Sequence, residues 1–508
     1  MPNIQNIYAQ YKKAVAKRNL WESTWQECYE YALPQRETAF SESNSKINRL
    51  FDATAPDCVD QLSALMLSEM TPPWQRWFQL TAGTDLTHEE TAEISPTLEL
   101  ISDTLQAHFD RSNFALEIHQ CYLDLITAGT ACLLFEEAPL GYNSAFRFLS
   151  VPLSEICLAE GPSGRLDITF RKTQMDYLSL KERFPDFELS NKAIQALTKD
   201  EAKISIIESV IPRVNGGYHY TVFLEPDNQH DSLSGVSPVL KESIFQTSPF
   251  ISFRWLKAPG EVYGRSPVMK TLPDIKTANK VVELILKNAS IAVTGIWLAE
   301  DDGVLNPSNI KLAPGAIIPK AVGSKGLMPL ESPGNFDVSQ LIIDNLQRHI
   351  RHALLGDKLA ELDDERMTAT EVRIRNSQMM RILGATYGRL QSELLMPLVE
   401  RATSLLRRRG EIPEVYIDGR ILKVAYQSTR AEEQAQKDAE NALTWFGTII
   451  KMGDTALQTI DVPNFVKWLG RKLNVPAELM NASMGTDNPV HLADLNKRDL
   501  AKLASSIT

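Results

Sequence analysis

The chain has 508 residues, of which 43% are hydrophobic and 23% charged, and its formal net charge at pH 7 is −11. This composition indicates a folded protein with several subdomains and excludes an intrinsically disordered chain. The acidic balance argues against a protein that grips nucleic acid by neutralising phosphates. No apolar run reaches the roughly 20 residues of a membrane span, and residues 1–20 lack the charge order of a signal peptide. We therefore expect no membrane partner.

The first half of the chain predicts helices followed by strands. Apolar spacing predicts helices at residues 4–33, 57–70, 89–110 and 114–128, and the first stops before Pro34. Strands are predicted around residues 77–80 and at 131–136, 146–151, 203–214 and 218–223, with a hairpin turn at residues 161–164. Trp74, Trp77 and Phe78 could stack on bases, but aromatic residues at this spacing are typical of a core. Residues 1–265 are expected to form one α+β block.

A regular helix follows the sequence Gly260-Glu-Val-Tyr-Gly-Arg-Ser-Pro267 and runs from about Leu272 to Val293. Its apolar residues step by three and four, as on one packed helix face: Ile275, Ala278, Val282, Ile285, Ala289 and Ala292. The opposite face carries four charged residues: Lys276, Lys280, Glu283 and Lys287. Such a stripe is typical of a solvated face and is equally compatible with a channel lining.

Residues 294–335 are rich in proline and glycine, which excludes a long helix and favours short strands at 295–298 and 316–319. A second helix is predicted to begin at Asp337-Val-Ser-Gln340, which resembles a capping box, and to end at Gly356. Its apolar side is predicted to be Leu341, Ile342, Leu346 and Ile350. Its basic stretch comprises Arg348, His349, Arg351 and His352.

Residues 357–367 hold five acidic and two basic residues, a net charge of −3. A long helix then starts at the capping box Thr368-Ala-Thr-Glu371 and ends in three arginines and Gly410. Pro397 is expected to bend this helix, and Gly384 and Gly388 to permit close packing or flexing. Short strands at 414–417 and 422–426 and a helical region at 431–503 complete the prediction.

Four segments carry a resemblance to the portal proteins, or head-to-tail connectors, of short-tailed bacteriophages. They occur in the family's order, and the resemblance extends over most of residues 1–443: Leu62–Met70 followed by Pro72-Pro-Trp-Gln-Arg-Trp-Phe78, Pro249-Phe-Ile-Ser-Phe-Arg254 leading into GEVYGRSP, Arg366-Met-Thr-Ala-Thr-Glu371, and Leu390-Gln-Ser-Glu-Leu-Leu-Met-Pro-Leu398. The resemblance implies an α+β, predominantly helical portal fold. Its parts are a wing (1–265), a stem helix (266–293), a clip (294–335), a return stem helix (336–355), a tunnel loop (356–367), a long wing and crown helix (368–410) and a crown (411–508).

The resemblance also implies a function without catalysis or a cofactor. Copies of the chain, twelve by resemblance, form a ring at one capsid vertex, through which double-stranded DNA is packaged and ejected. The implied partners are the terminase large subunit, the tail adaptor, and the major capsid and scaffolding proteins. By the same resemblance, the protein is expected to be made in the host cytoplasm and to reside in the virion. Residues assigned to the channel lining are Lys276, Lys280, Glu283, Lys287, Arg348, Arg351, His352, Lys358, Asp363, Asp364, Glu365 and Arg366. Residues assigned to partner binding at the clip are Asp301, Asp302, Asn306, Lys311, Lys320 and Lys325.

Two other classes of function stay open at this point: a metal-dependent nuclease that processes DNA, and a cellular helical scaffold. Asp363-Asp364-Glu365 would suit a nuclease, but adjacent carboxylates point in different directions. His349 and His352 lack a third metal ligand, and Gly323-Ser-Lys-Gly326 lacks the spacing of a phosphate-binding loop. The cysteines form no CxxC pair and are predicted to be buried thiols: Cys28, Cys58, Cys121, Cys132 and Cys157. We expect neither a metal site nor a catalytic site.

Overall fold

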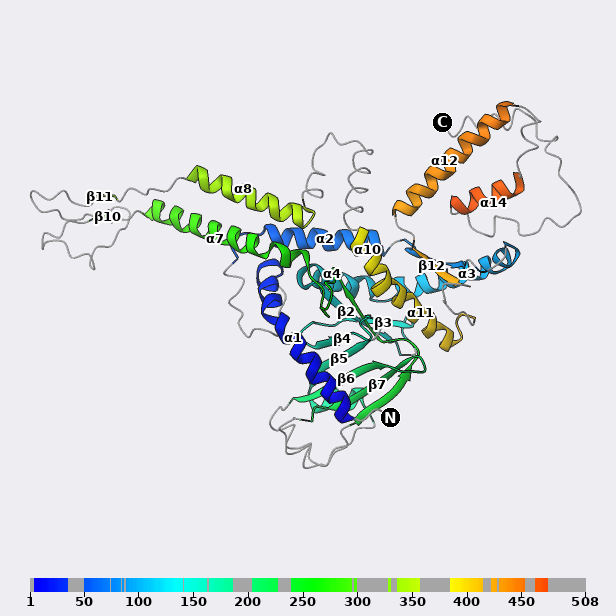
Figure 1. Cartoon of the computed structure of the whole chain (residues 1–508), viewed down its shortest axis with the longest axis horizontal. Helices are drawn as coiled ribbons and strands as arrows, with labels where there is room; N and C mark the ends of the chain where they lie inside the picture. The colour runs from blue at the N-terminus through cyan, green and yellow to red at the C-terminus, as the bar shows by residue number, and fades with distance from the viewer. Residues whose placement is uncertain are drawn as a thin grey trace, which may run out of the picture. The chain divides into compact units, whose positions relative to one another are not determined.

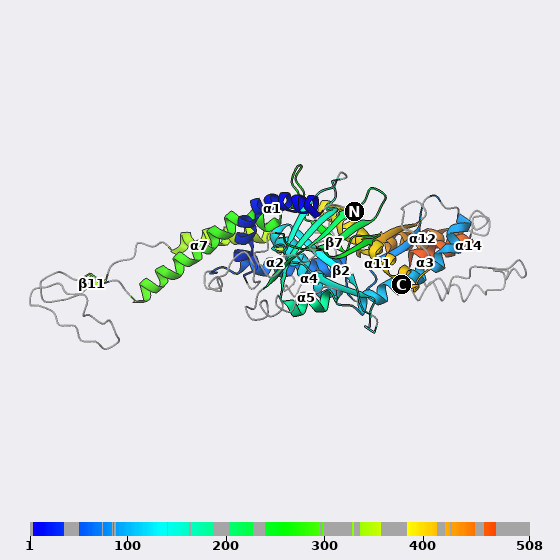
Figure 2. The same ribbon diagram turned by 90° about the horizontal axis from the view of Figure 1, so that it is seen from below.

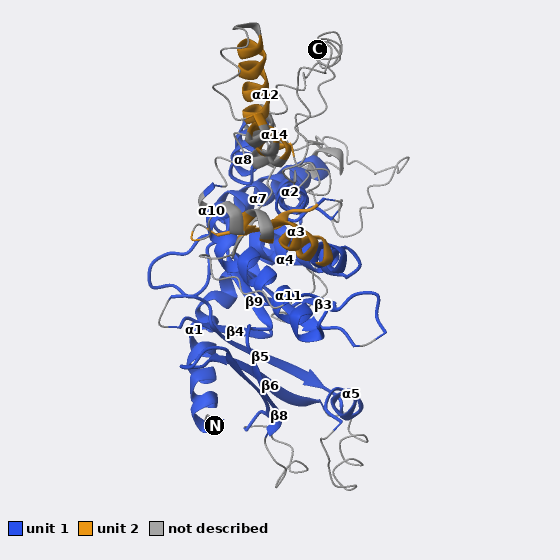
Figure 3. Cartoon of the chain, turned by 90° about the vertical axis from the view of Figure 1, so that its right-hand side faces the viewer, with its two compact units in different colours: residues 1–75, 105–415 blue, residues 76–104, 416–508 orange. Residues whose placement is uncertain are grey.

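The structure is a computed structural model, and it describes residues 4–34, 50–73, 75–83, 85, 88–139, 141–161, 164–185, 203–226, 239–294, 297–298, 328–329, 336–356, 384–413, 422–426, 429–452 and 462–473. The chain divides into two compact units (Figure 3). The first unit comprises residues 1–75 and 105–415, and the second comprises residues 76–104 and 416–508. Both units combine helices with sheet, so the predicted α+β composition is confirmed.

Two antiparallel sheets form the centre of the first unit. The smaller sheet has the strand order β3-β2-β9, and its strands are β2 (Thr130–Glu137), β3 (Phe146–Ser150) and β9 (Phe250–Arg254). The larger sheet has the order β4-β5-β6-β7-β8. Its strands are β4 (Ile156–Ala159), β5 (Ile168–Met175), β6 (Ile204–Pro212), β7 (Tyr218–Leu224) and β8 (Val239–Phe245). The predicted strands in residues 131–223 and the hairpin turn that follows β4 are confirmed.

Helices with one apolar face pack around these sheets. The helices of this unit before β2 are α1 (Ile4–Ala32), α2 (Thr54–Met70) and α4 (Phe114–Ala128), all close to the predicted ranges. The first part of α1 lies along the larger sheet (Figures 1 and 2), where Ile7, Tyr11 and Ala14 pack against Phe170 and Phe223. A short helix, α5 (Tyr177–Arg183), follows β5.

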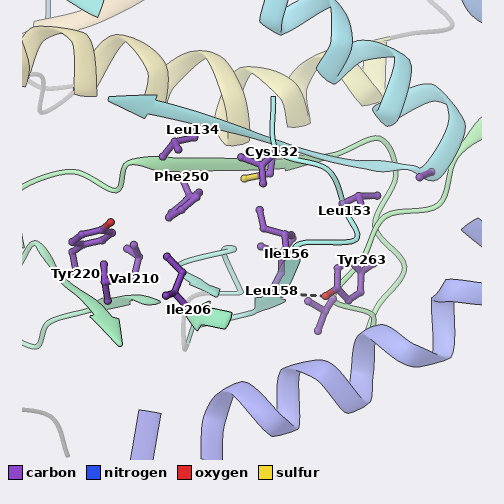
Figure 4. Packing of buried hydrophobic residues seen from close by; sticks show 14 of the residues in the cluster. Cys132, Leu134, Leu153, Ile156, Leu158, Ile206, Val210, Tyr220, Phe250 and Tyr263 are labelled. Atoms are coloured by element: carbon purple, nitrogen blue, oxygen red, sulfur yellow. Dashed lines mark hydrogen bonds between the residues drawn. The ribbon is translucent and has the colours of Figure 1, made fainter. Parts of the chain in front are cut away.

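A large hydrophobic cluster lies between the two sheets and the later part of α1. Cys132 and Phe250 enter it from the smaller sheet, and Ile156 and Ile206 enter it from the larger one (Figure 4). Trp25 from α1 belongs to the same cluster and is fully buried. Tyr263, which follows β9, also belongs to this cluster. Because such packing is as dense as an organic crystal, the loop that carries Tyr263 is fixed to the sheets on which it rests.

The second unit joins an early segment to the C-terminal part of the chain. Strand β1 (Phe78–Ala82) pairs antiparallel with β12 (Leu422–Tyr426), with Phe78 opposite Tyr426. The unit also contains most of α3 (His88–Asp110), which continues into the first unit, together with α12 (Thr429–Met452) and α14 (Val462–Lys472). The rings of Phe446 and Phe465 stack at 4.8 Å and join α12 to α14.

Several side-chain predictions can be checked here. Trp77 and Phe78 are buried, as predicted for core residues, whereas Trp74 lies outside the described residues. All five cysteines are buried free thiols, which confirms that prediction. Burial raises the pKa of Cys132 to about 12, so this thiol stays protonated and unreactive at neutral pH. The predicted strand at 414–417 lies outside the described residues.

Candidate functional site

Helices α7 (Pro267–Thr294) and α8 (Phe336–Ala353) lie side by side (Figure 1). Between them in sequence, β10 (Trp297–Leu298) pairs with β11 (Met328–Pro329). The predicted packed face of α7 is confirmed in its first half, where Ile275 and Ala278 are buried. The predicted strand at 295–298 is confirmed at its last two residues, and the one at 316–319 lies outside the described residues.

The apolar side predicted for α8 is partly wrong. Leu341 and Ile342 are 65% and 44% exposed, whereas Ile343 and Ile350 are buried. Ile343 and Ile350 are seven positions apart, which places them on one face of an α-helix. Leu341 and Ile342 therefore lie outside the buried face and leave two large apolar side chains on the surface of the helix pair.

The turn that precedes α7, residues 255–266, holds the start of that helix, and we call it the α7 anchor. Ser266 is its cap: the Ser266 Oγ accepts a hydrogen bond from the Met269 N–H at 2.8 Å and donates one to the Thr127 carbonyl at 2.8 Å. Pro267 then occupies the first helical position, where its missing N–H costs nothing. The buried Tyr263 hydroxyl accepts a hydrogen bond from the Leu158 N–H at 3.1 Å. The GEVYGRSP motif is therefore a helix start bound to α4 and to the larger sheet.

Glycine is required at two positions where the anchor meets the end of α4. Gly129 caps α4 with φ +78° and approaches the backbone of residues 264–266 so closely that an added Cβ would lie 2.7 Å from Ser266 N. A Cβ on Gly264 would collide with the Gly129 carbonyl oxygen and lie 2.9 Å from the Arg254 Cβ. Only a residue without a side chain fits at either place.

Three polar side chains, none of them predicted from the sequence, hold α7 and α8 against the start of α2. The Asn279 Oδ1 on α7 accepts hydrogen bonds from the Phe51 and Asp52 backbone N–H groups at 2.6 and 3.2 Å. The Asp52 Oδ1 in turn accepts hydrogen bonds from Gln347 of α8 and from Thr54, both at 2.9 Å. Asn279 is buried next to Ala278 on the packed face, and a polar residue at such a position was the available sequence signal.

The charged residues of α7 are bound mainly to carboxylates. Lys280 and Lys287 both contact Glu283, at 2.9 and 2.5 Å, and form a cluster with one excess positive charge. Hydrogen bonds from these two lysines hold the pKa of the Glu283 carboxyl below its usual value. Lys276 instead pairs with Glu27 of α1 at 2.6 Å and lies over the Tyr31 ring. Lys280 and Lys287 are exposed, whereas Lys276 is only half-exposed.

On α8, the predicted basic residues Arg348, His349, Arg351 and His352 are all exposed. Arg348 donates a hydrogen bond to Asn345 at 3.0 Å, one turn earlier on the same helix. The remaining candidate residues for the channel and the partner surface lie outside the described residues: Lys358, Asp363, Asp364, Glu365, Arg366, Asp301, Asp302, Asn306, Lys311, Lys320 and Lys325.

The predicted long helix is described from Gly384 onward and is divided by a π-helical turn. Its parts are α10 (Gly384–Leu390), the π turn η6 (Gln391–Leu395) and α11 (Met396–Arg409). Pro397 cannot donate to the Glu393 carbonyl, and its ring would clash with it in an α-helix. The wider turn, in which the Met396 N–H bonds to the Gln391 carbonyl, accommodates this proline. Gly384 and Gly388 have open space beside them, so the predicted close packing is not seen there.

Two buried arginines attach this helix to the sheets. Glu393 in the π turn pairs with Arg254 of β9 at 2.7 Å, and Arg254 is 1% exposed. Arg401 of α11 donates hydrogen bonds to the carbonyls of Phe135 and Thr247 at 2.7 and 2.8 Å. Burial lowers the pKa of Arg401 to about 9, and the nearby positive charge of Arg408 acts in the same direction. Neither arginine was singled out from the sequence, because each partner lies far away in the chain.

Within the residues that the structure describes, no group of three His, Cys, Asp or Glu side chains is arranged to hold a metal ion. Among those same residues, no helix combines the length and the apolar character needed to cross a membrane. What the structure does contain is a pair of long helices with a rigid anchor at one end and exposed charges along their length. This arrangement can position a charged surface.

Comparison with known proteins identifies a family and several relatives. The family model for the bacteriophage head to tail connecting protein matches residues 5–480. A probable portal protein of Bordetella phage BPP-1 is 22% identical over 91% of this chain and 86% of the relative. The portal protein of Salmonella phage epsilon15 is 23% identical over 88% of this chain and 83% of the relative. The portal protein of Enterobacteria phage T3 is 21% identical over 80% and 75%, respectively.

Among solved structures, the neck of an empty gene transfer agent particle aligns with a TM-score of 0.36 and 12% identity, covering 77% of this chain and 86% of the other. Because the family model spans nearly the whole sequence, the chain belongs to the bacteriophage head-to-tail connecting protein family.

Proposed function

We propose that this chain is the portal subunit of a phage capsid, which forms the passage for double-stranded DNA during packaging and ejection. The observation that carries this function is the family match over residues 5–480, which includes the α7 anchor and the helix pair. Three curated relatives that align with most of this chain bear the name portal protein. A nuclease is not favoured, because the family match and the relatives named portal protein point to a head-to-tail connector.

Within this function we assign the parts of the subunit as follows. Residues 1–265 are the wing, 266–293 and 336–355 the two stem helices, and 294–335 the clip that binds the terminase large subunit and later the tail adaptor. Residues 356–367 are the tunnel loop, 368–410 the long helix and 411–508 the crown. The exposed charges of α7 and α8 support placing the stem helices along the channel, with Lys280 and Arg348 among the residues that face DNA.

The oligomeric form that we propose is a closed ring of twelve copies at one capsid vertex, in contact with the major capsid and scaffolding proteins. The exposed Leu341 and Ile342 support it, because a single subunit leaves them uncovered. Negative-stain imaging and native mass measurement at micromolar concentration test the ring directly. Only monomers or dimers at several salt concentrations would contradict it. The purified ring is expected to hydrolyse no ATP, and hydrolysis that a point change in this chain abolishes would refute that expectation.

A second experiment tests the tunnel loop. Deleting residues 359–365 should leave rings intact but impair packaging or retention of DNA, since the loop acts on DNA by sterics and weak repulsion. Replacing Asp363, Asp364 and Glu365 with lysine should slow translocation most at low salt, where screening is weakest. Unchanged packaging in both variants would refute the assignment, and failure of rings to form would mean that the segment is structural.

A matched control for the lysine variant changes the charge equally at a distant surface. Asp176, Glu182 and Glu242 are exposed and lie at the start of α5, within α5 and on β8. Their replacement by lysine should leave translocation unchanged at every salt concentration. If the control slows translocation as much as the tunnel-loop variant, the effect comes from total charge and not from the loop.

A further inference from the structure

One buried side chain, that of Arg254, touches both the α7 anchor and the π turn. Its Nη1 donates hydrogen bonds to the Val262 carbonyl at 3.0 Å, within the anchor, and to Glu160 at 2.6 Å. Its Nη2 donates to the Glu393 Oε1 at 2.7 Å, and its Nε to the Glu393 Oε2 at 3.2 Å. The Arg254 backbone N–H donates to the same Oε2 at 3.0 Å. One planar group therefore binds two elements that lie far apart in the sequence.

The contacts around Arg254 make this link specific for arginine. Glu160 also pairs with Lys257, and Glu393 also accepts a hydrogen bond from Arg389 at 3.1 Å, so both carboxylates carry a second cation. Although burial opposes it, hydrogen bonds from Lys257 and Arg254 hold the pKa of Glu160 below its usual value. A lysine at position 254 has a single ammonium group and cannot present the two-sided fork that reaches Val262 and Glu393 together.

The described part of the helix before the π turn carries two glycines, Gly384 and Gly388, and a Cβ added at either would find open space. Glycine lowers the stability of a helix, so this segment relies on contacts with its surroundings. Thr386 is buried, as is the last residue, Leu390, and the next turn is fixed by Glu393. The contacts at the C-terminal end of α10 therefore contribute to its order.

We propose that Arg254 couples the two elements, so that displacement of the α7 anchor loosens the π turn and lowers the helical population of α10. The coupling is reciprocal, because a free energy shared between two sites acts in both directions. Under the proposed function, on which this reading rests, α7 is a channel helix, and α10 belongs to the long helix that follows the tunnel loop. Arg254 is then the positioning residue that couples the stem helix α7 to that long helix.

Hydrogen exchange on the purified full-length protein tests the coupling in a double-mutant cycle. Ser266→Ala removes the cap and perturbs the anchor without touching Arg254. We expect it to speed amide exchange in residues 384–396 about tenfold in the protein with Arg254, and less than twofold in the Arg254→Lys background. Equal acceleration by Ser266→Ala in both backgrounds, or none in either, would overturn the proposal. If Arg254 only stabilises the fold, Ser266→Ala changes the exchange rate by the same factor with and without it.

Two further variants protect the interpretation. Arg183→Lys is the matched control, because Arg183 also binds a buried carboxylate, that of Glu208 at 3.1 Å, and its ion-pair partners Glu208 and Glu136 lie on β6 and β2 and not in the anchor or the π turn. It should leave the tenfold effect intact, and losing that effect would count against the proposal. If Arg254→Lys does not fold, Glu393→Gln replaces it, since it keeps the shape of the side chain and removes its charge. In that background the effect of Ser266→Ala should again fall below twofold, and an undiminished tenfold effect would overturn the coupling.

The result can be separated from the proposed function. Exchange is measured whether or not the protein forms rings or passes DNA. If no rings form but Ser266→Ala speeds exchange only in the presence of Arg254, the portal function alone is contradicted. If normal rings form but Ser266→Ala speeds exchange equally in both backgrounds, the coupling alone is contradicted.

Discussion

Replacing Gly264 with alanine tests whether the α7 anchor depends on contact between two backbones. The added Cβ would meet the Gly129 carbonyl oxygen and would lie 2.9 Å from the Arg254 Cβ. Neither neighbour is the free end of a flexible side chain, so the clash can be relieved only by moving the anchor away from α4. An ordinary contact at a Cβ requires a separation near 3.4 Å, and the displacement is therefore of the order of 1 Å.

The magnitude follows from the hydrogen bonds that cross this contact. They join the Gly264 N–H to Thr130 Oγ1 at 2.8 Å, the Trp255 N–H to the Gly129 carbonyl at 2.9 Å, and Ser266 Oγ to the Thr127 carbonyl at 2.8 Å. A shift of this size breaks them, at about 1 kcal/mol each. Overpacking adds about 1–3 kcal/mol, and partial relaxation removes some of both. We expect local stability to fall by about 3–5 kcal/mol.

Native-state hydrogen exchange at the Gly264 and Trp255 amides measures this loss directly, because it reports local opening. The expected acceleration is at least about a hundredfold, since 1.4 kcal/mol corresponds to a factor of ten. The matched control is Gly260→Ala in the same turn. Gly260 has φ +83° but no atom within 4 Å of an added Cβ, so only backbone strain of about 1–2 kcal/mol applies. If Gly264→Ala speeds exchange no more than the control does, the close backbone contact is not what fixes the anchor.

Three other substitutions test separate parts of the structure. Gly388→Ala should stabilise α10 by up to about 1 kcal/mol, seen as slower exchange in residues 384–390, because open space surrounds this glycine; faster exchange would contradict it. Arg401→Met should lower the free energy of unfolding in denaturant by about 1–3 kcal/mol through two unpaired carbonyls, whereas Met at the exposed Arg408 should cost less than about 1 kcal/mol; equal losses would count against the buried role. Burial raises the pKa of Glu400 above its ordinary value of 4.5, so its stability contribution is complete below that pH and lost as pH rises through the raised pKa. Glu400→Gln should therefore be more stable than the wild type at pH 7, by less than about 1 kcal/mol, with no difference near pH 4; a constant difference across this range would exclude titration of Glu400 as the cause.

Local sequence patterns predicted the helices well, because burial on one helix face repeats every three or four residues. Ile275 and Ala278 show this for α7, because the spacing of its apolar residues alone predicts the side that is buried. Leu341 and Ile342 of α8 show the limit of the method. They are as apolar as Ile343, but only the partner elements decide which of three consecutive apolar residues is covered.

The anchor and the π turn could not be predicted from local sequence patterns, because their structural roles depend on contacts with residues far away in the chain. Gly264 is essential through its contact with Gly129, and its N–H binds Thr130, 134 residues away in the chain. Pro397 was expected to bend the helix, and it does interrupt the α-helical pattern. The form of the interruption is a wider turn whose Glu393 reaches Arg254, 139 residues earlier. Nothing near either residue in the sequence indicates that contact.

Under the proposed portal function, the ion pairs of α7 bear on how a channel helix avoids binding DNA tightly. Lys280 and Lys287 both contact Glu283, so a DNA phosphate that approaches either lysine competes with a carboxylate already in place. An exposed ion pair contributes only about 0–1 kcal/mol, so exchanging a carboxylate for a phosphate changes the free energy little in either direction. Lysines without a carboxylate partner at the same positions would each gain a full phosphate contact and release counterions. This would raise the affinity for DNA at every step of its movement. Under the proposed portal function, Glu283 is therefore expected to reduce the friction on DNA and not to attract it. Glu283→Gln should strengthen binding of short duplex DNA to purified rings, with a steeper dependence on salt, and unchanged affinity and salt dependence would refute this role.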